Sequence, residues 1–219
     1  MLKSTIAKLL GRERANRVSA PYYDWQARRR TLRNLAALPA ADLLVNLGCG
    51  PSPMDGWVNV DIARGPRIDV VWDLRSPLPF ADNSCSAIFC EHVIEHLSKK
   101  DGEKLLGECY RILQPGGVVR FSTPDAERFL RSYAGDGEFL RHAEFPRPIE
   151  TPLDRINTMM REDGQHLWAY DSQSLGVALS HAGFNTVVVQ RFGESRHAKM
   201  QNIDTPGRAF ESFYIEAIK

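Results

Sequence analysis

The sequence has no apolar run long enough to cross a membrane, since a spanning helix needs roughly 20 predominantly apolar residues. It also shows no apolar core of a secretory signal, and its four cysteines have neither a CxxC pair nor zinc-finger spacing. These absences argue against a membrane-spanning protein, a secreted disulfide scaffold and a zinc finger. With 219 residues, 43% of them hydrophobic, the chain suits a single soluble domain, which we expect in the cytoplasm.

The net charge of +1 is small but unevenly distributed. Up to Leu35 the chain carries nine basic and two acidic residues, so this head has a charge of +7 and the remainder −6. We expect two helices here, over 3–17 and 22–37, which together make residues 1–40 a helical cover. A solvated helix face is the simplest interpretation of the charge; nucleic acid, an anionic membrane or an anionic substrate are alternatives.

One face of the first predicted helix is apolar. Its residues are Leu2, Ile6, Leu9 and Leu10. Such a face among basic side chains is compatible with weak contact at a membrane surface.

From Leu43 the pattern changes to short apolar runs bounded by Gly, Pro and Asp, which is typical of buried parallel strands. We expect strands at 43–47, 57–61, 69–73, 86–90, 117–122, 186–192 and 210–217. Helices are expected over about 93–113 and from Asp171 or Ser172 to about His181. Residues 135–165 are polar and proline-containing, and they predict a long loop or lid within a domain that spans 41–219.

The connections between the first three predicted strands are short. A parallel crossover usually takes about a dozen residues or more, most often with a helix. We therefore expect no full helix in either connection, and the head helices are the available cover for the sheet face left bare.

Polar or glycine-rich segments follow each of the first three strands. Gly48-Cys49-Gly50 follows the first, Asp61 ends the second, and Asp73-Leu74 follows the third. Glycines allow positive φ and close approach of a ligand to the backbone. A carboxylate can accept ribose hydroxyls or an exocyclic adenine amine, and ligands of open α/β sheets bind at the carboxyl ends of the strands.

The series NLGCG, VNVD, WDL, LPFADNSCSAIFCEHVIEHL and LQPGG resembles the class I S-adenosylmethionine (SAM)-dependent methyltransferases, especially small bacterial type 11-like enzymes. The resemblance is strong over 43–124 and weaker toward the C-terminus. It implies a Rossmann-like α/β fold. Such a fold has a seven-stranded, mostly parallel sheet with an antiparallel last strand and helices on both faces; here the helices between the first three strands would be reduced.

The resemblance also implies a cofactor site for SAM and its product S-adenosylhomocysteine. Gly48, Cys49 and Gly50 would line the methionine part, Asp61 with Ile62 the ribose, and Asp73 with Leu74 the adenine. Glu91 would contact the cofactor or face the acceptor, and Asn46 stands where the family usually has an acidic residue. A dinucleotide is disfavoured, because the third glycine of G-x-G-x-x-G is absent.

His92 follows the fourth strand beside the expected methyl group and is our first candidate for a general base. The alternative is that His92 caps the helix or shapes the pocket. His166 follows the lid and is a second candidate that could return to the active site. His92, Glu95 and His96 resemble the metal-binding pattern of quinone-biosynthesis O-methyltransferases, but a solvated helix end is the simpler interpretation, and we expect no metal.

Three functional hypotheses follow. The favoured one is methyl transfer to a small-molecule acceptor, with O-methylation of a sugar, glycoconjugate precursor or other metabolite as the expected reaction. A nucleic-acid methyltransferase is less favoured, because no Asn/Asp-Pro-Pro-Tyr/Phe motif follows the fourth strand. A SAM-binding protein without catalysis is the third, and the sequence leaves the acceptor and the oligomeric state open.

Overall fold

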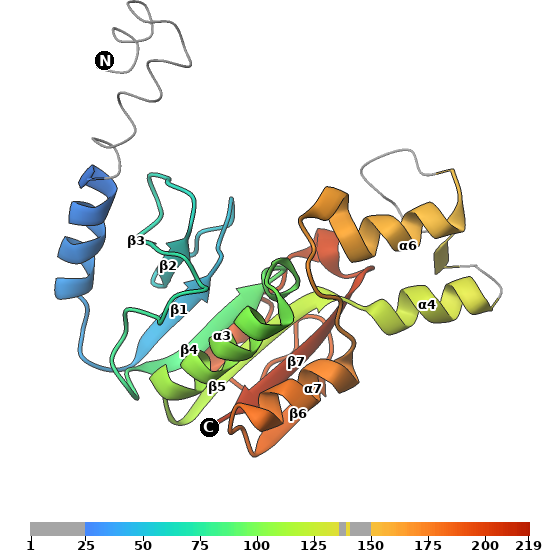
Figure 1. The fold of residues 1–219 in the computed structure, drawn as a ribbon. Coiled ribbons are helices and arrows are strands. Elements are labelled where there is room, and N and C mark those ends of the chain that lie inside the picture. The colour runs from blue at the N-terminus through green and yellow to red at the C-terminus, as the bar shows by residue number, and fades with distance from the viewer. Residues whose placement is uncertain (1–24, 136–138, 141–149) are drawn as a thin grey trace, which may run out of the picture.

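The computed structural model of the chain describes residues 25–135, 139–140 and 150–219, and its centre is one seven-stranded sheet (Figure 1). The strands in spatial order are β3 (Val70–Val71), β2 (Val58–Asp61), β1 (Leu43–Leu47), β4 (Cys85–Glu91), β5 (Leu113–Pro124), β7 (Ser212–Ile218) and β6 (Thr186–Gln190). All neighbours pair in parallel except β7, which is antiparallel to both β5 and β6. This confirms the predicted Rossmann-like fold class.

Two helices cover one face of the sheet, α3 (Lys99–Ile112) over β4 and β5 and α7 (Ser172–His181) beside β6 and β7 (Figure 1). Leu105 and Leu106 of α3 and Leu175 of α7 are fully buried in the main core. They share this core with alternate residues of β1, which are Leu43, Val45 and Leu47. The alternation follows from the two-residue period of a β-strand.

The opposite face has a smaller apolar cluster. It consists of Ala87, Phe89, Val118 and Met200, with Met54, Trp57 and Ile203 packed around them. Among the described residues this cover comes from loops and from the short 3₁₀ helix η3 (Ala198–Met200). As expected from the short crossovers, no described helix lies between β1 and β2 or between β2 and β3.

The described part of the head is a helix at 25–36 that lies along the edge strand β3 (Figure 1). Thr31 Oγ1 accepts a hydrogen bond from the backbone N–H of Val71, and Asn34 Nδ2 donates to the carbonyl of Asp69. Leu35 and Leu38 pack against the same core as α3. This helix therefore protects the edge of the sheet, and the predicted first helix at 3–17 lies outside the described residues.

The predicted helix over 93–113 is wrong in its first turn. The structure has a 3₁₀ turn, η1 (Ile94–His96), then an extended residue, Leu97, before α3 begins. Ser98 accepts a hydrogen bond from the N–H of Asp101 and starts a new helix as its N-cap.

The predicted loop over 135–165 is wrong for its second half, because α6 (Pro152–Arg161) and η2 (Glu162–Gly164) lie within it. Pro152 occupies the first turn of α6, where its missing N–H has no helical partner to lose. Ile156 and Met159 bury their side chains against Phe129 of α4 (Ala126–Ala134), which follows β5. The two helices lie side by side beyond one end of the sheet (Figure 1).

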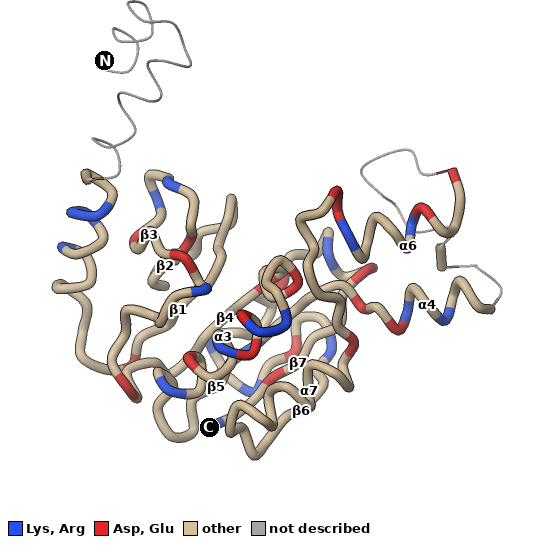
Figure 2. Tube along the Cα trace, viewed as in Figure 1, with Lys and Arg blue, Asp and Glu red and all other residues tan. Residues whose placement is uncertain are grey.

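Charged side chains are spread over the described surface with both signs interspersed on α3 and α4, whereas the helix at 25–36 carries basic residues (Figure 2). Arg30 of that helix donates to the carbonyls of Gly65 and Pro66, so one of these charges has a structural role. Within the described ranges, none of the helices combines the length and the apolar character needed to traverse a bilayer.

Candidate active site

The turn after β1 brings the backbone close to the chain that follows β4. Gly48 has φ +64°, and a Cβ at this position would lie 2.3 Å from Cγ2 of Val93. Gly50, with φ +49°, donates its N–H to Oδ2 of Asp61 at 2.8 Å. Only glycine meets both the left-handed conformation and the close approach to Val93 at Gly48. The predicted positive φ is confirmed, and the approach of a ligand to this turn stays a prediction.

Asp61 connects this turn to the end of β2. Its Oδ1 accepts the N–H of Ala63 at 2.6 Å, while Oδ2 accepts that of Gly50. The side chain is held in one orientation by these two bonds. Each carboxylate oxygen has a further lone pair, so ligand hydroxyls could still be accepted.

A pocket of about 450 Å³ opens at this edge of the sheet. Six of the predicted site residues line it: Gly48, Asp61, Ile62, Asp73, Leu74 and His92. The sequence analysis missed the others, which are Arg75, Val93, His96, Leu97, Ser98, Asp101 and Leu167. Asp61 and Asp73 therefore face one cavity, at the carboxyl ends of neighbouring parallel strands.

Asp73 is paired within the pocket wall. The guanidinium of Arg75 donates to both of its oxygens, at 2.6 Å from Nη2 to Oδ2. Hydrogen bonding from the Arg75 side chain is the main reason why the pKa of Asp73 lies below its usual value. Asp73 is thus an ionised acceptor, and its contact with adenine stays a prediction.

Four of the predicted cofactor residues do not line this pocket: Asn46, Cys49, Gly50 and Glu91. Cys49 is buried, and its burial, together with the charge of Asp61, raises the pKa of its thiol to about 11. Asn46 donates to the side chain of Asn59 and to the carbonyl of Ser52, which fixes the loop that follows the glycine turn. Gly50 acts through its bond to Asp61, described above.

Glu91 also lies outside the pocket wall. Its carboxylate accepts hydrogen bonds from the N–H of Thr205 at 3.0 Å and from the Thr205 hydroxyl at 2.5 Å. These bonds tie the end of β4 to the segment before β7. The contacts of Glu91 are structural, and its role toward the cofactor stays a prediction.

A second pocket, of about 810 Å³, adjoins the first. His92 and His96 line both pockets, and His166 lines the second. The remaining wall comes from the end of β5, α6, η2 and the chain around η4 (Pro206–Arg208). It comprises Pro124, Thr158, Met159, Glu162, Thr205, Pro206, Gly207, Arg208, Phe210 and Glu211.

His92 is buried between the pockets with both ring nitrogens engaged. Nε2 lies 2.7 Å from the Ser212 hydroxyl, and Nδ1 lies 2.9 Å from Nη1 of Arg208. Nδ1 also lies 3.2 Å from Oε1 of Glu95, so this nitrogen faces both a cation and a carboxylate. These contacts support the alternative that His92 shapes the pocket, while its role as a base stays a prediction.

Burial also affects Glu211, which lies in the second pocket near His92. Burial raises the pKa of its carboxyl, and the positive charges nearby offset this only in part. Arg208 lies 3.5 Å from the Glu211 carboxylate. The second pocket therefore contains both donors and acceptors for a polar ligand.

A Rossmann-like sheet with a glycine turn and two acidic residues around one pocket defines the class of SAM-dependent methyltransferases. Residues 22–189 match the family described as "Methyltransferase domain", and the chain belongs to this family. SAM is accordingly its cofactor, with S-adenosylhomocysteine as the product of methyl transfer.

Individual relatives agree with this assignment. The chain is 29% identical over 136 residues to a ubiquinone/menaquinone biosynthesis C-methyltransferase of Pseudoalteromonas translucida, covering 54% of the chain and 53% of that protein. It is 40% identical over 67 residues to a probable SAM-dependent methyltransferase of Mycolicibacterium smegmatis, and this match covers 31% of the chain and 25% of that protein. The alignment thus spans about half the length of the quinone enzyme. A SAM-dependent methyltransferase from Archaeoglobus fulgidus shares the fold, with a TM-score of 0.50 and 16% sequence identity. The match covers 90% of this chain and 94% of that one.

The pocket residues that the sequence analysis missed fall into two groups. Arg75, Ser98 and Asp101 stand close in sequence to predicted site residues, and charge or capping potential was their only signal. Arg208 and Glu211 lie far along the chain in a segment without a recognisable motif. Only the packing of that segment against β4 and β5 brings them to the site.

Proposed function

We propose that this protein transfers the methyl group of SAM to an oxygen atom of a small-molecule acceptor, such as a sugar, a glycoconjugate precursor or another metabolite. The observation that carries the proposal is the meeting of two pockets at His92 and His96. SAM would occupy the pocket with Gly48 and Asp61. An acceptor in the adjoining pocket could then approach the methyl carbon.

The reaction requires alignment above all. The acceptor oxygen attacks the methyl carbon, the carbon–sulfur bond breaks, and the sulfur keeps the electron pair as S-adenosylhomocysteine forms. Well-oriented reactants can lower such a barrier by roughly 7–11 kcal/mol. The acceptor proton must pass to a base or to water, and both predicted bases, His92 and His166, line the acceptor pocket.

The size and lining of the second pocket support a small polar acceptor. Its volume of about 810 Å³ is in the range of small-molecule sites. Hydroxyl, carboxylate, guanidinium and imidazole groups line it, which suits a ligand with several oxygen atoms. The quinone-biosynthesis relative is named as a C-methyltransferase, so methylation at carbon is the competing outcome.

The test is incubation of the protein with methyl-labelled SAM and a cell extract, followed by mass spectrometry of the products that acquire label. Nuclear magnetic resonance of the labelled methyl group then distinguishes an O-methyl from a C-methyl product. The Asp61→Ala variant serves as the control for labelling that does not depend on the cofactor pocket.

We expect label in a small polar metabolite, as an O-methyl group. Label on carbon would overturn the proposed atom, and label in nucleic acid would overturn the small-molecule acceptor. A protein that binds SAM and labels nothing would be a SAM-binding protein without catalysis.

A further inference from the structure

Glu95 is a buried carboxylate without a hydrogen bond. Its side chain is 2% exposed, and neither of its oxygens accepts a hydrogen bond. Its nearest charged neighbour is His92, whose Nδ1 lies 3.2 Å from Oε1 and also 2.9 Å from Nη1 of Arg208. A buried carboxylate without a hydrogen bond is costly to hold, and a bound cation would offset this cost.

Two histidines stand next to this carboxylate. His96 follows it directly, and its ring meets that of His166 edge to face, with centroids 4.8 Å apart. The N–H groups of Leu167 and Trp168 both donate to the backbone carbonyl of Glu95, and this pairing brings His166 to the site. One ligand atom from each of Glu95, His96 and His166 lies within 4.8 Å of the other two.

The orientation of both rings matches that of metal-binding histidines. His96 Nδ1 lies 3.3 Å from the carbonyl oxygen of Gln165, and His166 Nδ1 lies 2.5 Å from that of Met159. A histidine ligand usually donates its second ring N–H to such an outer acceptor, and this fixes the tautomer. In both residues Nε2 is then the nitrogen that can bind a metal.

We propose that Glu95, His96 and His166 form a binding site for one divalent transition-metal ion, with zinc as the best match. Two imidazoles and one carboxylate are the protein ligands of several open zinc sites, whereas magnesium and calcium prefer oxygen. The sequence analysis expected no metal, and it considered His92 as the third member of the cluster with Glu95 and His96. The structure brings His166 there, and the bonds to Arg208 and Ser212 engage both nitrogens of His92.

Binding requires a modest closure of the site. Ligand atoms of a tetrahedral zinc ion lie about 3.4 Å apart, given bonds of roughly 2.1 Å. Both histidines line the second pocket, which leaves space for their side chains to shift toward the ion. Nε2 of His166 now meets the carboxylate of Glu162 at 2.9 Å, and that side chain, 42% exposed, can turn into solvent when the ion binds.

The ion would keep an open coordination position toward the acceptor pocket, because His96 and His166 line its wall. An acceptor hydroxyl bound there would give its proton to water more readily and attack as the alkoxide, with His166 acting as a metal ligand in place of a base. This part of the inference rests on the proposed function, whereas the metal site itself does not.

The experiment uses the full chain without an affinity tag, stripped of metal by a chelator and dialysed. Zn²⁺ is titrated by calorimetry, and Co²⁺ by its visible absorption, in the absence of SAM and acceptor. We expect one ion per chain and a Co²⁺ spectrum typical of nitrogen and oxygen ligands. Glu95→Gln and His166→Ala should each weaken Zn²⁺ binding at least about tenfold, the scale of even outer-shell changes.

His181→Ala is the matched control, since this histidine lies on α7 outside the cluster and should leave Zn²⁺ binding unchanged. SAM titration of each metal-free variant tests whether its fold and cofactor pocket are intact. The proposal is overturned if the wild type binds no stoichiometric ion, or if His166→Ala binds Zn²⁺ as tightly as the wild type. SAM binding and methyl transfer by a protein that binds no ion would remove the metal site and leave the proposed function standing.

Discussion

Asp61 organises the proposed cofactor pocket through two hydrogen bonds from the backbone. Gly50 precedes it by eleven residues and Ala63 follows it by two, and both donate their N–H groups to its carboxylate. The same side chain lines the pocket. A single residue thus fixes the glycine turn and presents a hydrogen-bond acceptor to the pocket that we propose for the cofactor.

Asp61→Ala should weaken SAM binding about 10- to 100-fold, because hydrogen bonds to a charged group contribute roughly 1.5–3 kcal/mol. Calorimetric titration with SAM and with S-adenosylhomocysteine measures the loss. Asp55→Ala is the matched control, since the Asp55 side chain is 98% exposed and pairs only with Arg67 on the surface. Equal affinities for the wild type and Asp61→Ala would remove Asp61 from the site.

Gly48→Ala should lower the free energy of unfolding by about 1–3 kcal/mol, because the new methyl group overlaps the Val93 side chain and φ is +64°. Urea denaturation measures the change. Gly107→Ala on α3 is the opposite case, since a Cβ there would point into open space and alanine favours helix. It should stabilise the protein by about 0.5–1 kcal/mol. An unchanged free energy of unfolding for Gly48→Ala would contradict the close approach of Gly48 to Val93.

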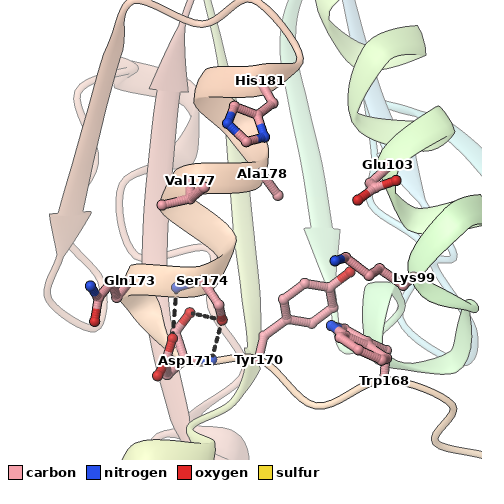
Figure 3. Close-up of a pocket in the computed structure, with 10 residues that line it drawn as sticks. All are labelled: Lys99, Glu103, Trp168, Tyr170, Asp171, Gln173, Ser174, Val177, Ala178 and His181. Atoms are coloured by element: carbon pink, nitrogen blue, oxygen red, sulfur yellow. Dashed lines mark hydrogen bonds between the residues drawn. The ribbon is translucent and has the colours of Figure 1, made fainter.

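At the scale of elements, capping decides where helices begin. Asp171 accepts the N–H of Ser174, and the Ser174 hydroxyl bonds back to the backbone of Asp171, so α7 starts with a capping box (Figure 3). Tyr170 and Trp168 precede this cap and lie between α7 and α3 (Figure 3). The cap therefore positions the chain that leads back to Leu167 and His166.

The Asp171 cap should make stability depend on pH. The N–H of Ser174 holds the pKa of Asp171 below 3.8, its usual value. The folded protein then binds the proton less tightly than the unfolded chain, so the contribution is present above about pH 4 and is lost as the pH falls through the folded-state pKa. Asp171→Asn keeps a cap that does not titrate, and urea denaturation between pH 7 and pH 3 should show a shallower acid loss. An identical acid slope in both proteins would contradict this assignment.

At the scale of the whole molecule, a buried ion cluster joins the segment before β7 to the sheet. Arg120 of β5 is fully buried and pairs with Asp204 at 2.6 Å and with Glu216 at 3.2 Å. Burial opposes its charge, but these carboxylates raise the pKa of Arg120 above its usual value. The cluster anchors the segment that carries Thr205 and Arg208 into the second pocket, which we propose for the acceptor.

Arg120→Met should reduce the free energy of unfolding by about 3–5 kcal/mol, because it leaves two buried carboxylates without their cation. Denaturant unfolding measures the loss. Arg131→Met, which breaks an exposed pair with Glu127 on α4, should cost less than about 1 kcal/mol. Similar losses for the two variants would show that the buried cluster does not hold the fold together.

The sequence alone determined the parts that depend on local pattern. The apolar runs placed all seven strands within a few residues, and the glycine turn, Asp61 and Asp73 were predicted for one edge because parallel strands end there together. The predicted bounds differ from the observed ones where strand pairing sets the length. The strand predicted at 69–73 is observed as Val70–Val71, because only these residues pair with β2.

Only the tertiary structure decided the contacts between distant segments. α6 is stabilised by packing against the apolar surface of α4. Its own sequence is a polar, proline-containing stretch whose local pattern does not predict a helix. His166 reaches Glu95 and His96 through backbone bonds across some seventy positions, and Arg208 reaches His92 from farther still. The hydrophobic period of a strand or helix and the capping of a helix are encoded in neighbouring residues. Contacts between segments far apart in the sequence depend on how whole surfaces pack, and such packing exists only in the folded chain.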